Sequence, residues 1–243
     1  HKNIAAALQL KLENFVINKL KAAKKKYGYK KLCLSGGVAL NCSMNGKIEQ
    51  SKIFDEIYIQ PASADDGCAI GACYLANIKN DKEHFIPKPN YNSYLGSRYS
   101  DDEIEKELKD SNLNYLKSLN IFKDTAEQLS KGRIIGWFQG AAEFGPRALG
   151  NRSILCKPYP SEMKDHLNNQ VKFRENFRPF APAVLSEYQK DFFEINQDSF
   201  HMLIASKVKE DKKDVIPAVV HVDRSARVQT VTKNSNEKFY KLL

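Results

Sequence analysis

Two neighbouring segments in the N-terminal part of the chain repeat one order of elements: a short apolar strand, a loop of small residues and a helix. They cover residues 32–50 and 57–78. Repeated units of this kind are typical of α/β folds, in which helices cover a sheet. Ligands of such sheets collect at the loops beyond the carboxyl ends of the strands. We therefore predict an α/β fold, α+β overall, with a binding site near the small residues of the two loops, which are Gly36, Gly37, Asp65, Asp66 and Gly67.

The rest of the chain alternates short helices and strands. Helices are expected over residues 4–26, 38–50, 69–78, 104–109, 124–131, 161–170 (capped by Ser161) and 236–243, and extended segments over 133–139, 153–156, 180–184, 201–208, 217–222 and 227–231. Residues 86–98 are assigned to a linker because apolar periodicity disappears there. Only two strands precede this linker, too few for an independent sheet. We therefore expect a fragment of a longer chain.

Basic residues beside Gly, Pro and Phe form three clusters in the second half of the chain. They cover residues 143–152, 172–182 and 221–227, within a net charge of +9. Arginine is a rigid fork of donors that matches phosphate and carboxylate oxygens. We predict that the three clusters converge on one polyanionic small molecule, most simply a nucleoside triphosphate with a second phosphorylated substrate. The candidate catalytic side chains are Arg147, Arg152, Lys172, Arg174 and Arg178, and Arg224 and Arg227 are candidates for cofactor binding.

Uncharged and acidic neighbours of these cations have expected roles of their own. Phe173, Phe177 and Phe180 are predicted to form a dry floor that keeps the cations rigid, because a low local dielectric strengthens each contact. Two interpretations stay open for Glu143, which could pair with an arginine or orient magnesium. Two also stay open for His221, as a proton carrier or a buried, hydrogen-bonded histidine.

Composition narrows the class of protein. No run of eighteen apolar residues predicts a membrane span, and the N-terminus lacks the apolar core of a signal peptide. The five cysteines are odd in number and include no C-x-x-C pair, which argues against a disulfide framework or a zinc knuckle. We expect mostly buried thiols and a cytoplasmic location.

Five motifs, in one order over nearly the whole chain, resemble O-carbamoyltransferases of the nodulation, cephalosporin and tobramycin type. They are L-S-G-G-V-A-L-N, P-A followed by D-D-G and A-I-G-A, E-F-G-P-R-A-L-G-N-R-S, R-E-N-F-R-P-F-A-P and H-V-D-R-S-A-R-V-Q-T-V. The resemblance implies a partial actin/hexokinase-like (ASKHA) lobe, the C-terminal half of a domain like that of tRNA threonylcarbamoyl-transfer proteins, over residues 1–85. It implies a YrdC-like α/β domain over 99–243. Family members continue past this point with a Gly-x-Pro stretch and an Asn-Thr-Ser-Phe-Asn segment, so this domain is expected to be truncated at its C-terminus.

The resemblance also implies an activity. Family members use ATP to convert carbamoyl phosphate to carbamoyl adenylate, and transfer the carbamoyl group to a hydroxyl of a sugar or natural product. ATP, carbamoyl phosphate and Mg²⁺ are therefore expected, and Fe²⁺ in the full-length protein. By position in the motifs, Gly36, Gly37, Asn41 and Gly67 would contact nucleotide and Asp65 would be a metal ligand. The family's other metal ligands form a His-x-x-x-His pair, and because no two histidines here are four apart, that pair is expected upstream.

Two alternatives remain for the function. One is a nucleic-acid-binding module of YrdC-like fold, suggested by the positive charge, and the other is threonylcarbamoyl-type tRNA modification. RNA-binding proteins spread their cations over an exposed face, whereas these cations lie in Gly/Pro turns, so nucleic acid is not the expected partner. The expected partner is a small-molecule hydroxyl acceptor, without a membrane, and a homodimer is left open.

Overall fold

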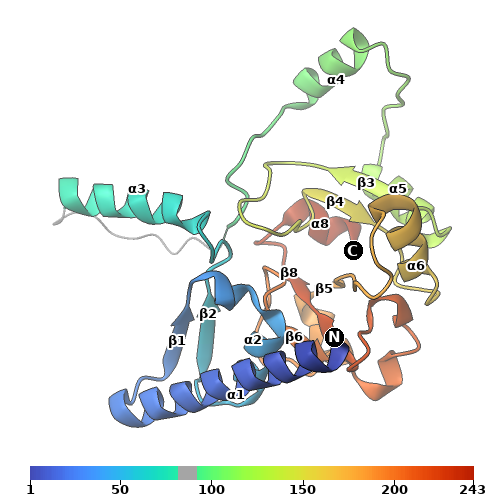
Figure 1. Ribbon diagram of the computed structural model, residues 1–243. Helices are drawn as coiled ribbons and strands as arrows, with labels where there is room; N and C mark the ends of the chain where they lie inside the picture. The colour runs from blue at the N-terminus through green and yellow to red at the C-terminus, as the bar shows by residue number, and fades with distance from the viewer. Residues whose placement is uncertain (82–91) are drawn as a thin grey trace.

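The computed structural model describes residues 1–81 and 92–243 (Figure 1). The first segment starts with the long helix α1 (Lys2–Tyr27), which ends where Gly28 adopts a left-handed conformation with φ 73°. β1 (Lys31–Leu34) then pairs in parallel with β2 (Glu56–Ile59), and α2 (Cys42–Gln50) connects them. These elements confirm the repeated strand–loop–helix units. The mixture of helices and small sheets confirms the α/β class, while the more specific ASKHA and YrdC-like assignments stay predictions.

The helix expected over residues 38–50 is broken in two. A 3-10 turn, η1 (Gly37–Leu40), comes first, and α2 starts only after Asn41, whose backbone is extended. The Asn41 side chain accepts a hydrogen bond from the Met44 N–H at 3.0 Å, so it caps α2. An asparagine is among the best residues for this position, and this explains why the helix restarts there.

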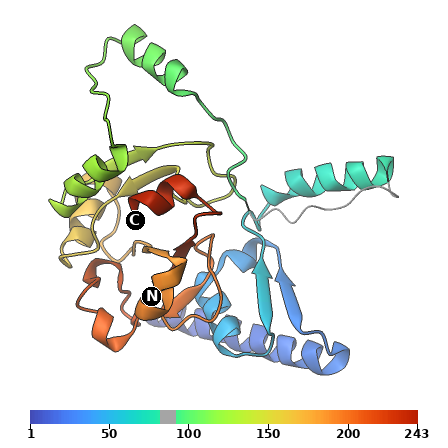
Figure 2. The ribbon, with the colours of Figure 1, turned by 180° about the vertical axis from the view of Figure 1, so that it is seen from behind.

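Two helices project from the body of the molecule. α3 (Gly67–Asn80) and α4 (Asp101–Asp110) stand away from the other elements in both views (Figures 1 and 2). α4 starts after Ser100, which forms a reciprocal capping box with Glu103. Three of the five cysteines, Cys33, Cys68 and Cys73, are exposed, so the prediction of mostly buried thiols is wrong. Cys33 lies on the exposed face of β1, and Cys68 and Cys73 lie on α3, which projects from the body.

The second half consists of short elements. The helices are α5 (Ile121–Ser130), α6 (Met163–Leu167), α7 (Gln189–Phe192) and α8 (Glu237–Leu242), and a π-helical turn, η2 (Asn168–Lys172), continues α6. The strands are β3 (Ile135–Phe138), β4 (Arg152–Leu155), β5 (Ala183–Leu185), β6 (Ala205–Lys207), β7 (Ser225–Arg227) and β8 (Gln229–Val231). β3 pairs with β4 and β6 with β7, both antiparallel, and β5 pairs with β8 in parallel.

Three local predictions in this half are wrong. Ser161 does not cap α6, whose N-cap is Glu162 without a side-chain bond. The expected strand over 217–222 is a 3-10 turn, η5 (Pro217–Val219), because proline fixes its own φ and supplies no N–H to a ladder. The single strand expected over 227–231 is divided between two sheets at Val228, whose side chain is fully buried.

One hydrophobic core joins the two halves of the chain. Ile48 and Ile57 from the first half share it with Phe193, Val208 and Val228 from the second. α2 packs directly on β6: a Cβ on Gly46 would lie 2.0 Å from the Ala205 carbonyl oxygen, so only glycine fits. The predicted domain boundaries over 1–85, 86–98 and 99–243 stay predictions, and part of that linker lies outside the described residues.

No helix of the described segments has the combination of length and apolar character that crossing a bilayer requires.

Candidate anion-binding site

The loop between β3 and β4, residues 143–152, is folded around the carboxylate of Glu143. Glu143 Oε1 accepts the backbone N–H of Leu149 at 2.8 Å, of Asn151 at 2.8 Å and of Arg152 at 3.1 Å. Hydrogen bonds to a charged acceptor are among the strongest in proteins. The carboxylate thus holds the loop itself. No arginine guanidinium is among these partners, and the magnesium role left open for Glu143 stays a prediction.

A buried amide network fixes the other side of this loop. Asn151 donates to the Ala141 carbonyl at 2.7 Å and accepts from Asn236 at 2.9 Å. Tyr94 accepts from Asn236 at 3.0 Å and donates its hydroxyl proton to the Leu149 carbonyl at 2.9 Å. Burial raises the Tyr94 pKa to about 12, so the phenol stays protonated. The network makes the loop rigid, and no sequence motif marked Tyr94 or Asn236 as part of the site.

The same loop lies against the first half of the chain. Gly145 has a φ of 114°, and a Cβ there would lie 3.3 Å from the Pro61 carbonyl oxygen. A left-handed backbone combined with close approach explains the glycine in this motif. Arg147 is therefore held at the junction of the two halves.

Three predicted arginines lie near enough to one another to interact electrostatically: Arg147 from the loop, Arg174 from the segment after η2, and Arg227 from β7. Arg227 is largely buried, and burial is the main cause that lowers its pKa. The positive charges of Arg147 and Arg174 lower it further, whereas the Cys42 thiol at the start of α2 acts in the opposite direction. We call Arg147, Arg174 and Arg227 the arginine group.

The arginine group has little internal compensation of its charge. Among the described residues, neither Arg147 nor Arg227 has a hydrogen bond or ion pair from its guanidinium, and Arg147 Nε is a buried donor without a partner. No carboxylate is among the groups that shift the Arg227 pKa. Gathering like charges in a partly buried place is unfavourable unless an anion joins them. The arrangement therefore suits a ligand with several negative charges.

Arg174 is positioned by a buried asparagine and an aromatic ring. Its Nε donates to Asn168 Oδ1 at 2.7 Å, and its guanidinium lies 4.6 Å from the centroid of Phe180. Asn168 is fully buried and also donates to the Arg178 carbonyl at 3.0 Å. Burial, followed by repulsion from Arg178, lowers the Arg174 pKa. Asn168 carried no signal in the sequence, because its neighbours resemble any polar helix end.

Lys172 and Arg178 lie beside Arg174 on an open hollow of about 700 Å³. Arg178 forms an exposed ion pair with Glu175 at 2.8 Å. Phe173 and Phe177 are 82% and 80% exposed, so the expected floor of three phenylalanines is wrong for these two. Of the three, Phe180 alone packs against a cation. Phe173 follows the π-helical turn in a left-handed conformation, with its ring exposed.

Arg152 and Arg224 have contacts of a different kind. The Arg152 guanidinium lies 3.5 Å from the Phe138 ring centroid and donates to four backbone carbonyls, those of Gln139, Gly140, Asn151 and Ser97. These bonds clamp the loop, and a catalytic role for Arg152 stays a prediction. Arg224 is exposed and pairs with Glu210 at 3.6 Å, so no observed contact joins it to the arginine group.

The predicted nucleotide contacts in the first half are occupied by local interactions. Gly36 has a φ of 96° and donates to the Ser63 carbonyl at 2.9 Å. The Asn41 amide exchanges two hydrogen bonds with Gln9, at 2.8 and 3.1 Å. A Cβ on Gly67 would lie 2.0 Å from the Ala62 carbonyl oxygen, whereas a Cβ on Gly37 would meet nothing within 4 Å. Nucleotide binding by these residues stays a prediction.

The expected metal ligand, Asp65, is exposed. Nowhere in the described segments do three His, Cys, Asp or Glu side chains gather closely enough to hold a metal ion. A transition metal needs three or four protein ligands, so the residues present here do not fit an iron site.

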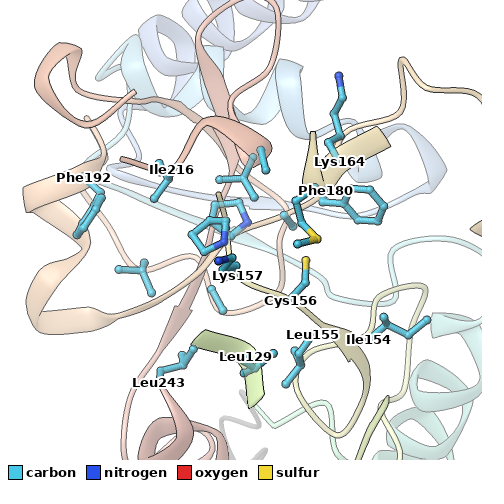
Figure 3. Close-up of a pocket in the computed structure, with 18 of the residues that line it drawn as sticks. Leu129, Ile154, Leu155, Cys156, Lys157, Lys164, Phe180, Phe192, Ile216 and Leu243 are labelled. Carbon is cyan, nitrogen blue, oxygen red and sulfur yellow. The ribbon is translucent and has the colours of Figure 1, made fainter. Parts of the chain in front are cut away.

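A separate cavity of about 420 Å³ lies between β4, β5, α6 and α8 (Figure 3). Its lining is mainly apolar and includes the cations Lys157 and Lys164, and burial raises the pKa of the Cys156 thiol in its wall to about 11. Apolar walls and a protonated thiol do not suit a polyanion. The arginine group is therefore the better candidate site for a charged ligand.

Comparison with known proteins gives the family. Models described as the N-terminus and the C-terminus of carbamoyltransferases match residues 1–74 and 126–243. Nodulation protein NolO of Bradyrhizobium diazoefficiens is 39% identical over 100% of this chain and 45% of its own length. Nodulation protein NolNO of Sinorhizobium fredii is 41% identical over 100% of this chain and 36% of its own length.

A third relative, nodulation protein U of Rhizobium tropici, is 33% identical over 100% of this chain and 41% of its own length. The chain thus spans less than half the length of these curated relatives. The two family models lie in consecutive order and together match most of the chain. The chain belongs to the carbamoyltransferase family.

Proposed function

We propose that the full-length protein is an ATP-dependent O-carbamoyltransferase, and that the arginine group binds the phosphates of its substrates. Family membership supports carbamoyl transfer. The observation that carries phosphate binding is the convergence of Arg147, Arg174 and Arg227 without a carboxylate among the groups that act on Arg227.

The proposed reaction has two stages. Carbamoyl phosphate, ATP and water give carbamoyl adenylate, pyrophosphate and phosphate: a carbamate oxygen attacks the α-phosphorus, and pyrophosphate leaves. A hydroxyl oxygen of the acceptor then attacks the carbamoyl carbon, AMP leaves, and the hydroxyl proton is released. In the first stage, negative charge builds on phosphate oxygens, so catalysis depends mainly on positioning and electrostatic stabilisation.

The residues can be assigned roles in that stage. Arg147 and Arg227 have guanidinium donors without protein partners among the described residues, so they can turn toward phosphate oxygens. Arg174 is already oriented by Asn168 and Phe180. Lys172 and Arg178 lie on the adjoining hollow, where they can attract a phosphate tail. Magnesium would accompany ATP, and iron in the full-length protein would need ligands beyond those described.

The acceptor is proposed to be a hydroxyl of a small molecule, either a sugar or a natural product. The nodulation proteins among the relatives support this choice over the nucleic-acid-binding module and tRNA modification. The arginine group favours a compact polyanion as well, because its cations converge instead of spreading over a face.

Calorimetry with ATP and with fresh carbamoyl phosphate tests phosphate binding. We expect the wild-type chain to bind at least one of them, and Arg147→Ala to weaken that binding by about 2.7–4 kcal/mol, by analogy with the loss of an oxyanion donor. Arg133→Ala is the matched control, because Arg133 is an exposed arginine just before β3. A folded wild-type chain that binds neither compound contradicts the proposal.

A further inference from the structure

A short hydrogen-bond chain beside the arginine group fixes the proton of a histidine. Asp223 Oδ1 lies 2.7 Å from Ser225 Oγ, and Ser225 Oγ lies 3.1 Å from His221 Nδ1. A carboxylate can only accept, so the single hydroxyl proton of Ser225 points to Asp223. The hydroxyl oxygen must then accept from Nδ1–H. Neutral His221 therefore carries its proton on Nδ1 and leaves a lone pair on Nε2.

The Nε2 lone pair has nothing to accept. Nε2 is buried, and no described residue donates a hydrogen bond to it. Burial, reinforced by the positive charge of Arg227, lowers the His221 pKa, although Asp223 acts in the opposite direction. The ring is thus a neutral acceptor. A buried acceptor without a partner is unfavourable, so its retention points to a ligand that supplies a donor.

The surroundings of His221 offer mainly donors to a ligand. Arg227 is close enough to shift the His221 pKa, and Arg147 and Arg174 in turn shift that of Arg227. Phosphate oxygens can satisfy guanidinium donors but cannot satisfy a lone pair. Because Arg147 and Arg227 have no hydrogen bonds to described residues, they can turn toward a phosphate bound beside His221.

We propose that His221 Nε2 accepts a hydrogen bond from the –NH₂ of the carbamoyl group and thereby selects a carbamoyl donor over its methyl analogue. This inference rests on the proposed function, since it places the carbamoyl group next to phosphates held by the arginine group. A methyl group at the same place leaves Nε2 unpaired, and a carboxylate there would repel its lone pair. The expected discrimination against methyl is on the order of 10- to 100-fold.

Two stable phosphonates that differ at one position test the proposal. Phosphonoacetamide ends in –CO–NH₂, and acetonylphosphonate ends in –CO–CH₃. Calorimetry on the whole chain is expected to show 10- to 100-fold tighter binding of the amide. His221→Leu should weaken amide binding to the level of the ketone and leave ketone binding nearly unchanged. His221→Gln, which keeps an acceptor oxygen, should retain part of the preference.

His166→Leu is the matched control, because His166 is exposed on α6, and it should keep the full preference. Equal binding of both phosphonates by the wild-type chain overturns the inference about His221 but leaves phosphate binding intact. Absence of binding for both compounds removes the proposed function together with the inference. His221→Leu weakening both compounds equally would show a structural role for the ring, and a preserved preference would assign selection to another residue. Either result overturns the proposal.

Discussion

The loops after the two parallel strands and the arginine group differ in how their polar groups are satisfied. In the loops, the Gly36 N–H donates to Ser63 and the Asn41 amide to Gln9. In the arginine group, Arg147 and Arg227 keep unpaired guanidinium groups beside each other among the described residues. Both regions carry binding motifs in the sequence, but only the second retains interactions that a ligand could complete.

The difference shows how well each kind of motif indicates a ligand site. Glycines and asparagines at strand ends are needed to build turns and caps whether or not a ligand binds there. A partly buried cation without a counter-charge has no such structural reason, because its desolvation opposes folding. Uncompensated charge is therefore the stronger sign of a site in this molecule.

The largest expected effect comes from removing one charge of the arginine group. Arg227→Met keeps the aliphatic stem and should weaken ATP or phosphonate binding by about 2.7–4 kcal/mol. Without ligand, the same variant should unfold at an equal or higher denaturant concentration, because it relieves repulsion from Arg147 and Arg174. Denaturant titration and calorimetry on one sample measure both.

Arg224→Met is the matched control for that experiment. Arg224 lies three residues earlier and pairs with Glu210 at the surface, where an ion pair contributes about 0–1 kcal/mol. Its binding and stability should therefore change little. Equal losses of binding in the two variants would erase the distinction between buried and exposed arginines.

A smaller effect is expected from the glycines of the first loop. Gly36→Ala should destabilise the chain by about 1–3 kcal/mol, since its φ of 96° and ψ of 154° belong to a region that is essentially limited to glycine. Gly37→Ala meets no atom within 4 Å and has no positive φ, so it should be nearly neutral. Thermal unfolding measures the difference.

Neither glycine variant should change phosphonate affinity if the loop is purely structural. Loss of binding in the stable Gly37→Ala variant would instead show that the loop contacts the ligand. That result would restore the predicted nucleotide role of the first loop and reduce the contrast between the two regions.

Part of the site could be predicted because its physics is local. Arginines next to glycine and proline, as in Gly145–Pro146–Arg147, indicated rigid cations, and the structure does gather Arg147 with Arg174 and Arg227. The sequence could not distinguish these arginines from Arg152. Whether a guanidinium is free for a ligand or bonds to backbone carbonyls, as in Arg152, depends on how the loop folds around Glu143. That fold needs Tyr94, which lies 55 residues before Leu149, its hydrogen-bond acceptor.

In the fold, too, features set by local sequence could be predicted and features set by distant contacts could not. The first helix, expected over residues 4–26 and observed over Lys2–Tyr27, follows from local apolar periodicity. The common core of Ile48 and Val228 was not predicted, because apolar periodicity shows that a face is buried but does not identify its partner. The break at Asn41 and the turn at Pro217 were missed where a single polar residue or proline outweighed the apolar pattern around it.

The smallest expected effect is a pH dependence of the folding stability, because it comes from the titration of a single residue, His221. The folded pKa of His221 is lowered by burial and by Arg227, below the value near 6.5 of an unfolded histidine. Between the two values the unfolded chain binds a proton that the folded chain does not, so stability falls as pH decreases below about 7. Asp223, whose folded pKa is also lowered, loses its contribution to stability only at more acidic pH.

Denaturant titrations at pH 5 to 7.5 measure this effect as the slope of the free energy of unfolding against pH. His221→Leu should reduce the slope seen in wild type, and Gly37→Ala should retain it. A slope unchanged in His221→Leu would mean that the ring is not held neutral beside Arg227.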